Sequence, residues 1–181
     1  MKVQDLMTCD VQCCHPEDDL GRAAQIMWDE DCGIVPVVSS DGGVAGVITD
    51  RDVCMAAWSR GLPLSAIRVL ETMAREILAC SPEDELDAAM LVMRRGRVRR
   101  LPVLDEGGIL VGILSLNDLA VEADRQEQRG PRQLSLSEVA TTLATVSWPR
   151  RSKLAQREQE PAEPTAKPIR ATSRVSARSE S

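Results

Sequence analysis

The chain lacks several features that would point directly to a function. Its 181 residues include no phenylalanine, no tyrosine and one histidine. Apart from three tryptophans it therefore has no aromatic platforms for stacking single-stranded nucleic acid, and a core that reads DNA or RNA is not expected. A single histidine also leaves little material for general acid–base catalysis.

Other absences bear on catalysis and location. The chain contains no Gly-x-x-x-x-Gly-Lys-Ser/Thr loop, no Gly-x-Gly-x-x-Gly and no His-Glu-x-x-His, the signatures of phosphate-binding loops, dinucleotide sites and zinc proteases. No run approaches the roughly eighteen apolar residues of a membrane helix, and the N-terminus is too polar for a signal peptide. We therefore expect a soluble cytoplasmic protein that is not an enzyme, needs no cofactor and binds no membrane.

All six cysteines lie within the first 80 residues, with no Cys-x-x-Cys pair, so we expect reduced thiols. Cys13, Cys14 and His15 are consecutive, and successive residues of a strand point to opposite faces. These side chains are therefore not expected to share a metal ion. Cys14 matches Cys80 in the repeat described below, as a buried apolar position would. A redox role for one of the thiols stays open.

Charge divides the chain into two parts. Residues 1–124 hold 11 Lys and Arg against 22 Asp and Glu, whereas residues 125–181 hold 11 against 6. An acidic part followed by a basic one rich in Pro, Ser and Ala is typical of a folded domain with a disordered extension. We therefore expect a disordered basic tail over residues 150–181.

Residues 125–149 are predicted to form a linker and a final helix. Ser137 is the candidate cap of this helix, and a proline follows its end. Its helical spacing is carried by Val139, Leu143 and Val146. Such a helix could pack on the folded part or against a second subunit.

The strongest feature of the sequence is an internal repeat. Without gaps, residues 1–54 align with residues 67–120 at an offset of 66 and match at 14 of 54 positions. Two copies at so long a period indicate a duplicated unit rather than a solenoid. We place the first repeat at residues 1–62 and the second at residues 63–124.

Each repeat reads as strand, helix, strand, strand, helix. A short apolar run, at residues 11–14 or 77–80, precedes a proline and a segment whose apolar residues fall on one helical face. Two apolar runs joined by a glycine turn then predict a hairpin, and a second helix starts near Asp50 or Leu116. Because about 55 residues bury too little surface alone, we expect an α+β fold of two pseudo-symmetric repeats packed sheet to sheet.

One spacing of glycine, hydroxyl and carboxylate recurs where the second helix of each repeat begins. It comprises Gly46, Thr49 and Asp52 in the first copy and Gly112, Ser115 and Asp118 in the second. One interpretation is a capping box that only stabilises the helix. The other is a nucleotide site, because a helix start binds phosphate and a carboxylate one turn later can accept hydrogen bonds from two ribose hydroxyls. The spacing alone favours capping, and its repetition favours binding.

On these residues the chain resembles a pair of cystathionine β-synthase (CBS) domains, a Bateman module, over roughly residues 1–123. The resemblance rests on a Met before a strand and a proline, on a Pro-Val hairpin strand and on Gly-x-x-Thr/Ser-x-x-Asp, in the same order in both copies. It implies a regulatory module that binds an adenosine-containing ligand, such as AMP, ADP, ATP or S-adenosylmethionine, in the cleft between the domains. We also expect a homodimer that signals to an unidentified partner protein.

Carried across by position, the resemblance implies two ligand sites. The hydroxyl and ribose contacts would be Thr49 and Asp52 in one site and Ser115 and Asp118 in the other. Beside them, Arg51 would add charge near the first phosphate, and Asn117 is its counterpart. The walls around the base would be formed by Cys13, Val35, Pro36, Ala79, Leu101 and Pro102. Cys13 stands where many members of the family have threonine.

The two copies differ most where their charge inverts. Residues 28–34 contain three acids, and the aligned residues 94–100 contain five arginines. These charges can belong to a solvated helix end and loop. They can also supply phosphate contacts near one site, and the candidates are Arg97, Arg99 and Arg100.

The sequence therefore predicts a stand-alone sensor of an adenosine-containing ligand. Two alternatives stay open. One is a structural dimerisation module whose Thr and Asp side chains only cap helices. The other is a tether that binds nucleic acid or anions through the basic tail.

Overall fold

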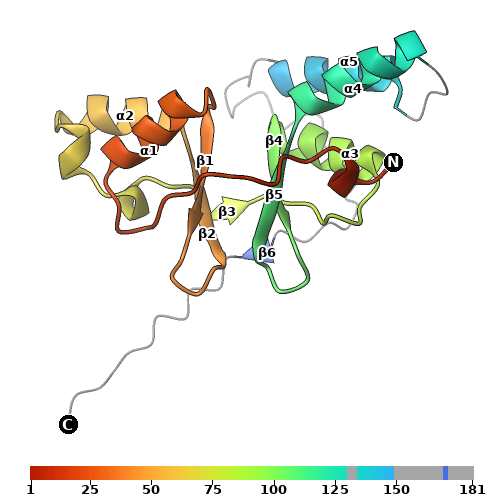
Figure 1. The fold of residues 1–181 in the computed structure, drawn as a ribbon. Coiled ribbons are helices and arrows are strands. Elements are labelled where there is room, and N and C mark those ends of the chain that lie inside the picture. The colour runs from red at the N-terminus through yellow and green to blue at the C-terminus, as the bar shows by residue number, and fades with distance from the viewer. Residues whose placement is uncertain (130–133, 149–168, 171–181) are drawn as a thin grey trace, which may run out of the picture. The chain divides into compact units, whose positions relative to one another are not determined.

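The computed structural model describes residues 1–129, 134–148 and 169–170, and Figure 1 shows its helices and strands. Apart from residues 169–170, the predicted disordered tail lies outside the described residues. Contacts divide the described chain into two compact units, which we name by the repeat that each contains. The first-repeat unit comprises Cys9–Ile77, Leu104–Gly112 and residues 169–170, and the second-repeat unit comprises Met1–Thr8, Leu78–Val103 and the described residues from Ile113 to 148.

The first-repeat unit packs two helices beside a hairpin (Figure 1). Its elements are α1 (Leu20–Asp29), β1 (Ile34–Val38), β2 (Val44–Thr49), α2 (Asp50–Arg60), two 3-10 turns (Leu64–Ala66 and Val69–Glu71) and β3 (Glu76–Ile77), which pairs with β6 (Ile169–Arg170). Its core joins Leu20 and Ile26 of α1 to Val35 and Ile48 of the hairpin. The helices therefore bury one side against the hairpin.

The second-repeat unit repeats this plan and adds one helix. Its elements are a 3-10 turn (Val3–Asp5), α3 (Leu86–Gly96), β4 (Arg100–Leu104), β5 (Leu110–Ser115), α4 (Leu116–Arg129) and α5 (Leu136–Ser147). The predicted α+β class, the two repeats, their hairpins and the C-terminal helix are confirmed. None of the helices in the described ranges has both the length and the apolarity that crossing a bilayer requires.

Local signals in the sequence explain where the helices of the first-repeat unit start and stop. The Asp19 carboxylate accepts a hydrogen bond from the Arg22 N–H at 3.0 Å and caps α1. Gly61 ends α2 in the left-handed conformation, at φ 63°, which glycine adopts without steric cost. The predicted start and stop of α2 are both confirmed.

The first predicted strand of each repeat is shorter than expected. Residues 11–14 contribute a single parallel bridge, at Cys14, whose N–H donates to the Pro36 carbonyl at 3.1 Å. The ladder cannot extend because neither Pro36 nor Pro16 carries an N–H. The second repeat shows the same single bridge, at Cys80. The sequence prediction overstated both of these strands.

Each hairpin is extended by the chain that precedes the other repeat. The two lead-in segments are residues 1–8 and 67–77. Ala74 and Val47 of β2 exchange both backbone hydrogen bonds, at 2.8 and 3.0 Å. Thr8 and Ile113 of β5 do the same, both at 2.9 Å. The domain limits predicted from the repeat stay a prediction about the sequence, and this exchange is not visible in them.

Helix α5 lies against α3 and α4 (Figure 1). Ser137 lies inside this helix rather than at its cap. The buried face carries Val139 and Thr142, whereas Leu143 is 50% exposed. The helix itself was predicted correctly, but Leu143 was assigned to the wrong face. The reason is that Arg94 of α3 donates to the Thr142 hydroxyl at 3.0 Å, which gives a polar residue a partner in that interface.

Candidate functional site

The first predicted site lies where β2 ends and α2 begins. The Thr49 hydroxyl donates to Oδ2 of Asp52 at 2.6 Å, and the Thr49 N–H donates to the same oxygen at 3.0 Å. The Asp52 N–H donates back to the Thr49 hydroxyl at 3.3 Å. These bonds form a complete capping box.

The second predicted site has the same geometry where β5 ends and α4 begins. Oδ2 of Asp118 accepts from the Ser115 hydroxyl at 2.7 Å and from the Ser115 N–H at 2.8 Å. The Asp118 N–H donates to the Ser115 hydroxyl at 3.1 Å. The motif therefore caps a helix in both repeats, as one of the two interpretations requires.

The capping boxes still leave capacity for a ligand. All of the bonds to Asp52 and Asp118 described above end on Oδ2, so each box engages one of the two carboxylate oxygens. An ionised carboxylate offers about four lone-pair sites, so it can accept a ligand hydroxyl while the helix stays capped. Capping and ribose binding are therefore compatible at the same residue.

The N–H groups at the start of α2 are less available than the sequence suggested. The Asp50 N–H donates to the Gly33 carbonyl at 3.3 Å, and the Arg51 N–H donates to the Asp50 carboxylate at 2.7 Å. An anion there would depend on the helix dipole and on the exposed Arg51 side chain rather than on unbonded N–H groups. Asn117 is exposed in the corresponding turn of α4.

The residues predicted to hold the base lie on strands beside each helix start. Ile34 pairs with Thr49, so Val35 and Pro36 follow on the strand next to the capping hydroxyl. Cys13 directly precedes the bridge on the other side of β1 and is half-buried. Because the Val35 side chain is 0% exposed, its backbone is the part that could face a ligand.

The second-repeat unit brings the equivalent residues together. Leu101 and Pro102 lie in β4, beside the strand that ends at Ser115. Ala79 directly precedes the bridge at Cys80 and is half-buried, and Leu101 is fully buried. Each predicted set of hydroxyl, carboxylate and strand residues is therefore gathered within one unit.

The glycine of the motif has a structural reason. A Cβ atom on Gly46 would lie 2.5 Å from the Ala74 carbonyl oxygen and 3.1 Å from the Met73 sulfur. Gly46 is therefore required by the lead-in segment that crosses β2, and the motif mixes a packing position with two polar ones.

Sequence reasoning missed Thr72, which lies in the lead-in segment of the first-repeat unit. Its hydroxyl oxygen is buried and has no hydrogen-bond partner among the described residues. Buried hydroxyls usually find a partner, so this oxygen is a candidate contact for a bound molecule or a water. No spacing in the sequence could have marked it, because a lone threonine before a methionine carries no motif.

The family of the chain follows from a match to a known family model. The model of the CBS domain matches residues 3–59 and again residues 66–124, which together span most of the described chain. The chain belongs to the CBS domain family. The duplication read from the sequence is therefore a pair of CBS domains.

Relatives of this CBS pair are found among both sequences and structures. The CBS domain-containing protein YhcV of Bacillus subtilis is 33% identical over 135 residues, which cover 75% of this chain and 94% of YhcV. Hypoxic Response Protein I, solved with two coordinated zinc ions, is 29% identical with a TM-score of 0.61, over 67% of this chain and 98% of that one. The CBS domain pair of protein MJ0100, solved with 5′-methylthioadenosine and S-adenosyl-L-methionine, is 21% identical with a TM-score of 0.59, over 67% and 98%, and shows a shared fold.

The three candidate arginines of this CBS pair lie in different surroundings. Arg99 donates to the Ser147 hydroxyl of α5 at 3.4 Å, so its guanidinium reaches toward that helix. The Leu116 N–H donates to the Arg99 carbonyl at 2.8 Å, which holds the start of β4 beside the start of α4. Arg97 ends α3 in the left-handed conformation, at φ 52°. Arg100, the first residue of β4, is therefore the arginine that the backbone places beside the second site.

The thiols of the CBS pair fall into buried and exposed classes. Burial raises the pKa of Cys14 and of Cys80 from 9.0 to about 12, and it also raises the pKa of Cys13. Within the described ranges, no three His, Cys, Asp or Glu side chains are grouped as a metal site would need, and His15 Nδ1 lies 2.8 Å from the Val38 carbonyl oxygen. The absence of a metal site stays a prediction.

Alkylation should separate these classes. At pH 8 we expect iodoacetamide to modify the exposed Cys9 and to leave Cys14 and Cys80 unmodified until the protein is unfolded. A pKa raised from 9.0 to about 12 lowers the reactive thiolate fraction about a thousandfold, and burial blocks access. Peptide mass spectrometry with and without denaturant measures this. Equal labelling of Cys9 and Cys14 in the native protein would contradict the structure.

Proposed function

We propose that this CBS pair is a regulatory module that binds an adenosine-containing ligand at the two helix starts capped by Thr49 and Ser115. The observation that carries the proposal is the duplicated geometry: in each unit a hydroxyl and a carboxylate stand beside a strand that contains a proline. The fold is compatible with such ligands, since the CBS domain pair of MJ0100 was solved with 5′-methylthioadenosine and S-adenosyl-L-methionine.

In this proposal each polar residue has a separate role. Asp52 and Asp118 accept hydrogen bonds from the ribose hydroxyls, using the oxygen that the capping box leaves available. Arg51 in the first unit and Arg100 in the second supply charge to phosphate or carboxylate groups. The base packs on strand backbone and aliphatic side chains, because the chain contains no Phe or Tyr to stack on it.

The output of such a module is a shift between conformations rather than a reaction. A ligand that binds one conformation more tightly than another changes their populations by the ratio of its affinities. The state is then read by a partner protein, and the proposed setting is the cytoplasm. The module supplies no catalytic group in this account.

Calorimetric titration of the full chain with AMP, ADP, ATP and S-adenosylmethionine tests the proposal. We expect at least one ligand to bind and the variants Asp52→Ala and Asp118→Ala each to weaken binding at one site by about tenfold or more. Each variant removes a hydrogen bond to a charged group, and such bonds contribute about 1.5–3 kcal/mol.

Asp19→Ala is the matched control, because Asp19 also caps a helix but lies outside the predicted sites. It should lower stability by about 1 kcal/mol, as the loss of a cap does, and leave ligand affinity unchanged. If no ligand gives heat, while Asp52→Ala and Asp118→Ala lower the melting temperature as Asp19→Ala does, the motif is structural only.

A further inference from the structure

Helix α2 has no polar side along most of its length. Residues 53–58 are six consecutive apolar residues, so they cover every side of the helix. Val53 and Ala56 are buried, but Trp58 is 78% exposed and Met55 is 46% exposed. A helix that is apolar all round is normally covered on all sides, so the outer side of α2 calls for a partner.

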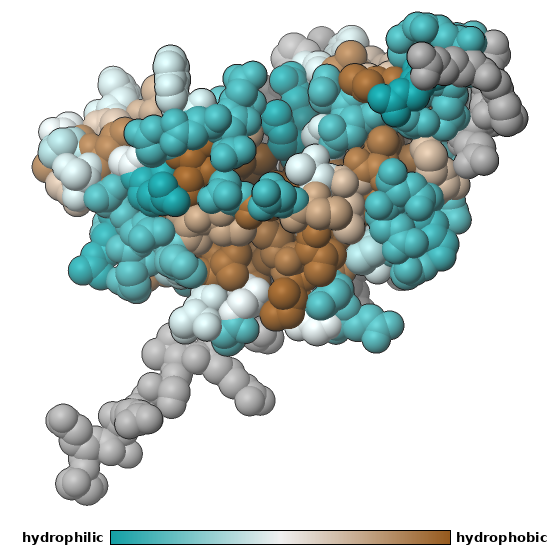
Figure 2. Space-filling view, in the orientation of Figure 1, coloured by the Kyte–Doolittle hydropathy of each residue, from teal (hydrophilic) through white to brown (hydrophobic). Residues whose placement is uncertain are grey.

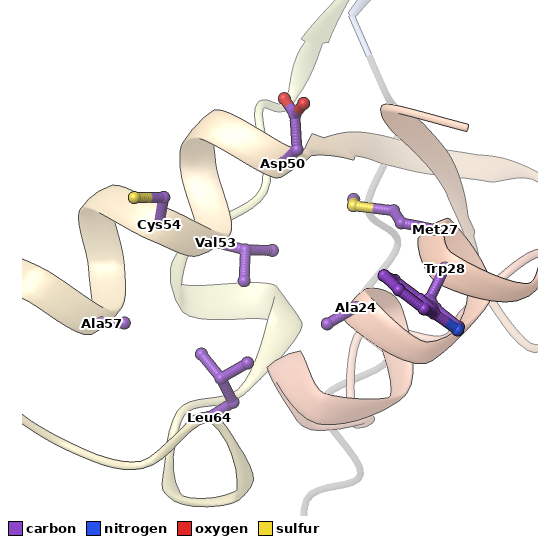
Figure 3. Close-up of a pocket in the computed structure, with 8 residues that line it drawn as sticks. All are labelled: Ala24, Met27, Trp28, Asp50, Val53, Cys54, Ala57 and Leu64. Atoms are coloured by element: carbon purple, nitrogen blue, oxygen red, sulfur yellow. The ribbon is translucent and has the colours of Figure 1, made fainter. Parts of the chain in front are cut away.

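An apolar groove runs between this helix and α1. It has a volume of about 450 Å³, which lies within the range of about 300–1,000 Å³ typical of binding pockets. Its lining residues are Ala24, Met27, Trp28, Asp50, Val53, Cys54, Ala57 and Leu64. Figure 3 shows the α1 residues on one wall and the α2 residues on the other, and Figure 2 shows brown and pale atoms among teal ones over these helices. Trp28 is 84% exposed at its edge.

The second-repeat unit shows how the same surface looks when it is covered. At the offset of 66, the equivalents of Ala24, Met27, Val53 and Ala57 are Met90, Met93, Leu119 and Ala123. None of these four equivalents is more than 1% exposed, and α5 packs on the two helices that carry them. The duplicated surface is therefore covered by a helix in one copy and open in the other.

We propose that a second copy of this chain docks on the α1/α2 groove, so that the protein self-associates through its first repeat while α5 occupies the equivalent face of the second repeat. The structure gives three arguments for a second copy as the occupant: the mixture of large and small residues in the groove, the distribution of charge along α1 and the covered equivalent.

The groove carries both halves of a self-complementary contact. Trp28 and Trp58 project from it as large exposed side chains, while Ala24, Cys54 and Ala57 leave space between the helices. A two-fold interface requires one patch to fit itself, with the large groups of each copy entering the space of the other. Buried tryptophans are among the residues that contribute most to such interfaces.

Charge along α1 also suits a two-fold. Arg22 lies near the start of the helix and Asp29 at its end, followed by Glu30 and Asp31, and all four are exposed. Two copies of α1 that cross antiparallel place the basic start of each beside the acidic end of the other. A parallel arrangement would bring like charges together.

The third argument comes from the equivalent residue of Trp28, which is Arg94. In the covered copy, Arg94 donates a hydrogen bond to the Thr142 hydroxyl of the covering helix at 3.0 Å. The open copy has a tryptophan at this position and so offers apolar area instead of a hydrogen bond. Its occupant is therefore expected to be an apolar surface such as the groove itself.

Sedimentation velocity of the full chain without nucleotide, over a wide range of concentrations, tests the proposal. We expect the wild type to sediment as two chains, and Trp58→Asp to raise the dissociation constant by about 30-fold or more, as the loss of a central interface residue does. Trp148→Asp and Leu143→Asp are matched controls, because both side chains are exposed outside the groove, and they should leave the dimer intact. Circular dichroism and thermal melting of each variant establish that it is folded.

Cys54 provides a second measurement on the unmodified chain. It lines the groove, so its rate of alkylation should fall as the protein concentration rises, whereas that of the exposed Cys9 should stay constant. A wild type that sediments as one chain at every concentration overturns the proposal, including the case in which it then binds another protein through the groove. A dimer that survives Trp58→Asp, or that Leu143→Asp dissociates, overturns it as well. Since no nucleotide is present, either result is independent of the ligand titration.

Discussion

Gly46→Ala is expected to lower the free energy of unfolding by about 3 kcal/mol, because the new methyl group would overpack a crowded backbone contact. The added Cβ would lie 2.5 Å from the Ala74 carbonyl oxygen, closer than such atoms approach. That oxygen accepts the Val47 N–H at 3.0 Å, so moving it away weakens the ladder between β2 and the lead-in segment. Urea denaturation of the variant and the wild type measures the difference.

Two other glycines supply controls for this prediction. Gly43→Ala should cost a few tenths of a kcal/mol, because its Cβ would first meet the Asp41 carboxylate at 3.4 Å, an ordinary contact. Gly96→Ala should fall between the two, because its Cβ would meet a methyl group of Leu78, which can rotate away, rather than backbone. Equal stability of the three variants would show that the lead-in segment does not cross β2 as closely as described.

Val139→Asp is expected to release α5 from the second-repeat unit. Val139 is 4% exposed, and an unpaired carboxylate at such a position costs about 3–5 kcal/mol, more than the docking of a short helix is expected to supply. The expected result is faster hydrogen exchange throughout α5 and in the faces of α3 and α4 beneath it, with the first-repeat unit unchanged.

Leu143→Asp is the control on the same helix, one turn further along. Leu143 is 50% exposed, so a carboxylate there stays in water and the exchange rates of α3 and α4 should not change. If Leu143→Asp released the helix and Val139→Asp did not, the face of α5 assigned to the interior would be wrong.

The elements that could be predicted from the sequence are those with local causes. The hairpins follow from apolar runs separated by glycine turns, and the bounds of α2 follow from a capping threonine and a terminal glycine. The face of α5 could not be predicted, because Thr142 is buried only through its hydrogen bond to Arg94, which lies far away in the sequence. Hydrophobic periodicity alone favours Leu143 instead.

The candidate site was predictable in its residues but not in its backbone detail. The spacing of Thr49 and Asp52 predicted either a cap or a ligand site, and the structure shows the cap while leaving ligand binding a prediction. The role of Gly46 depends on Ala74, which only the fold brings near. The α1/α2 groove was also missed, because Trp28 and Trp58 are distant in the sequence and show no shared pattern.

The exchange of lead-in segments also governs how the chain folds as it is made. The hairpin of the first repeat gains its third strand only when Ala74 pairs with Val47, after the start of the second repeat has left the ribosome. Thr8, near the start of the chain, waits for Ile113 near the end of the second repeat. Contacts of such long sequence separation are slow to form because loop closure must come first. The duplicated halves therefore complete their sheets in an interleaved order rather than one after the other.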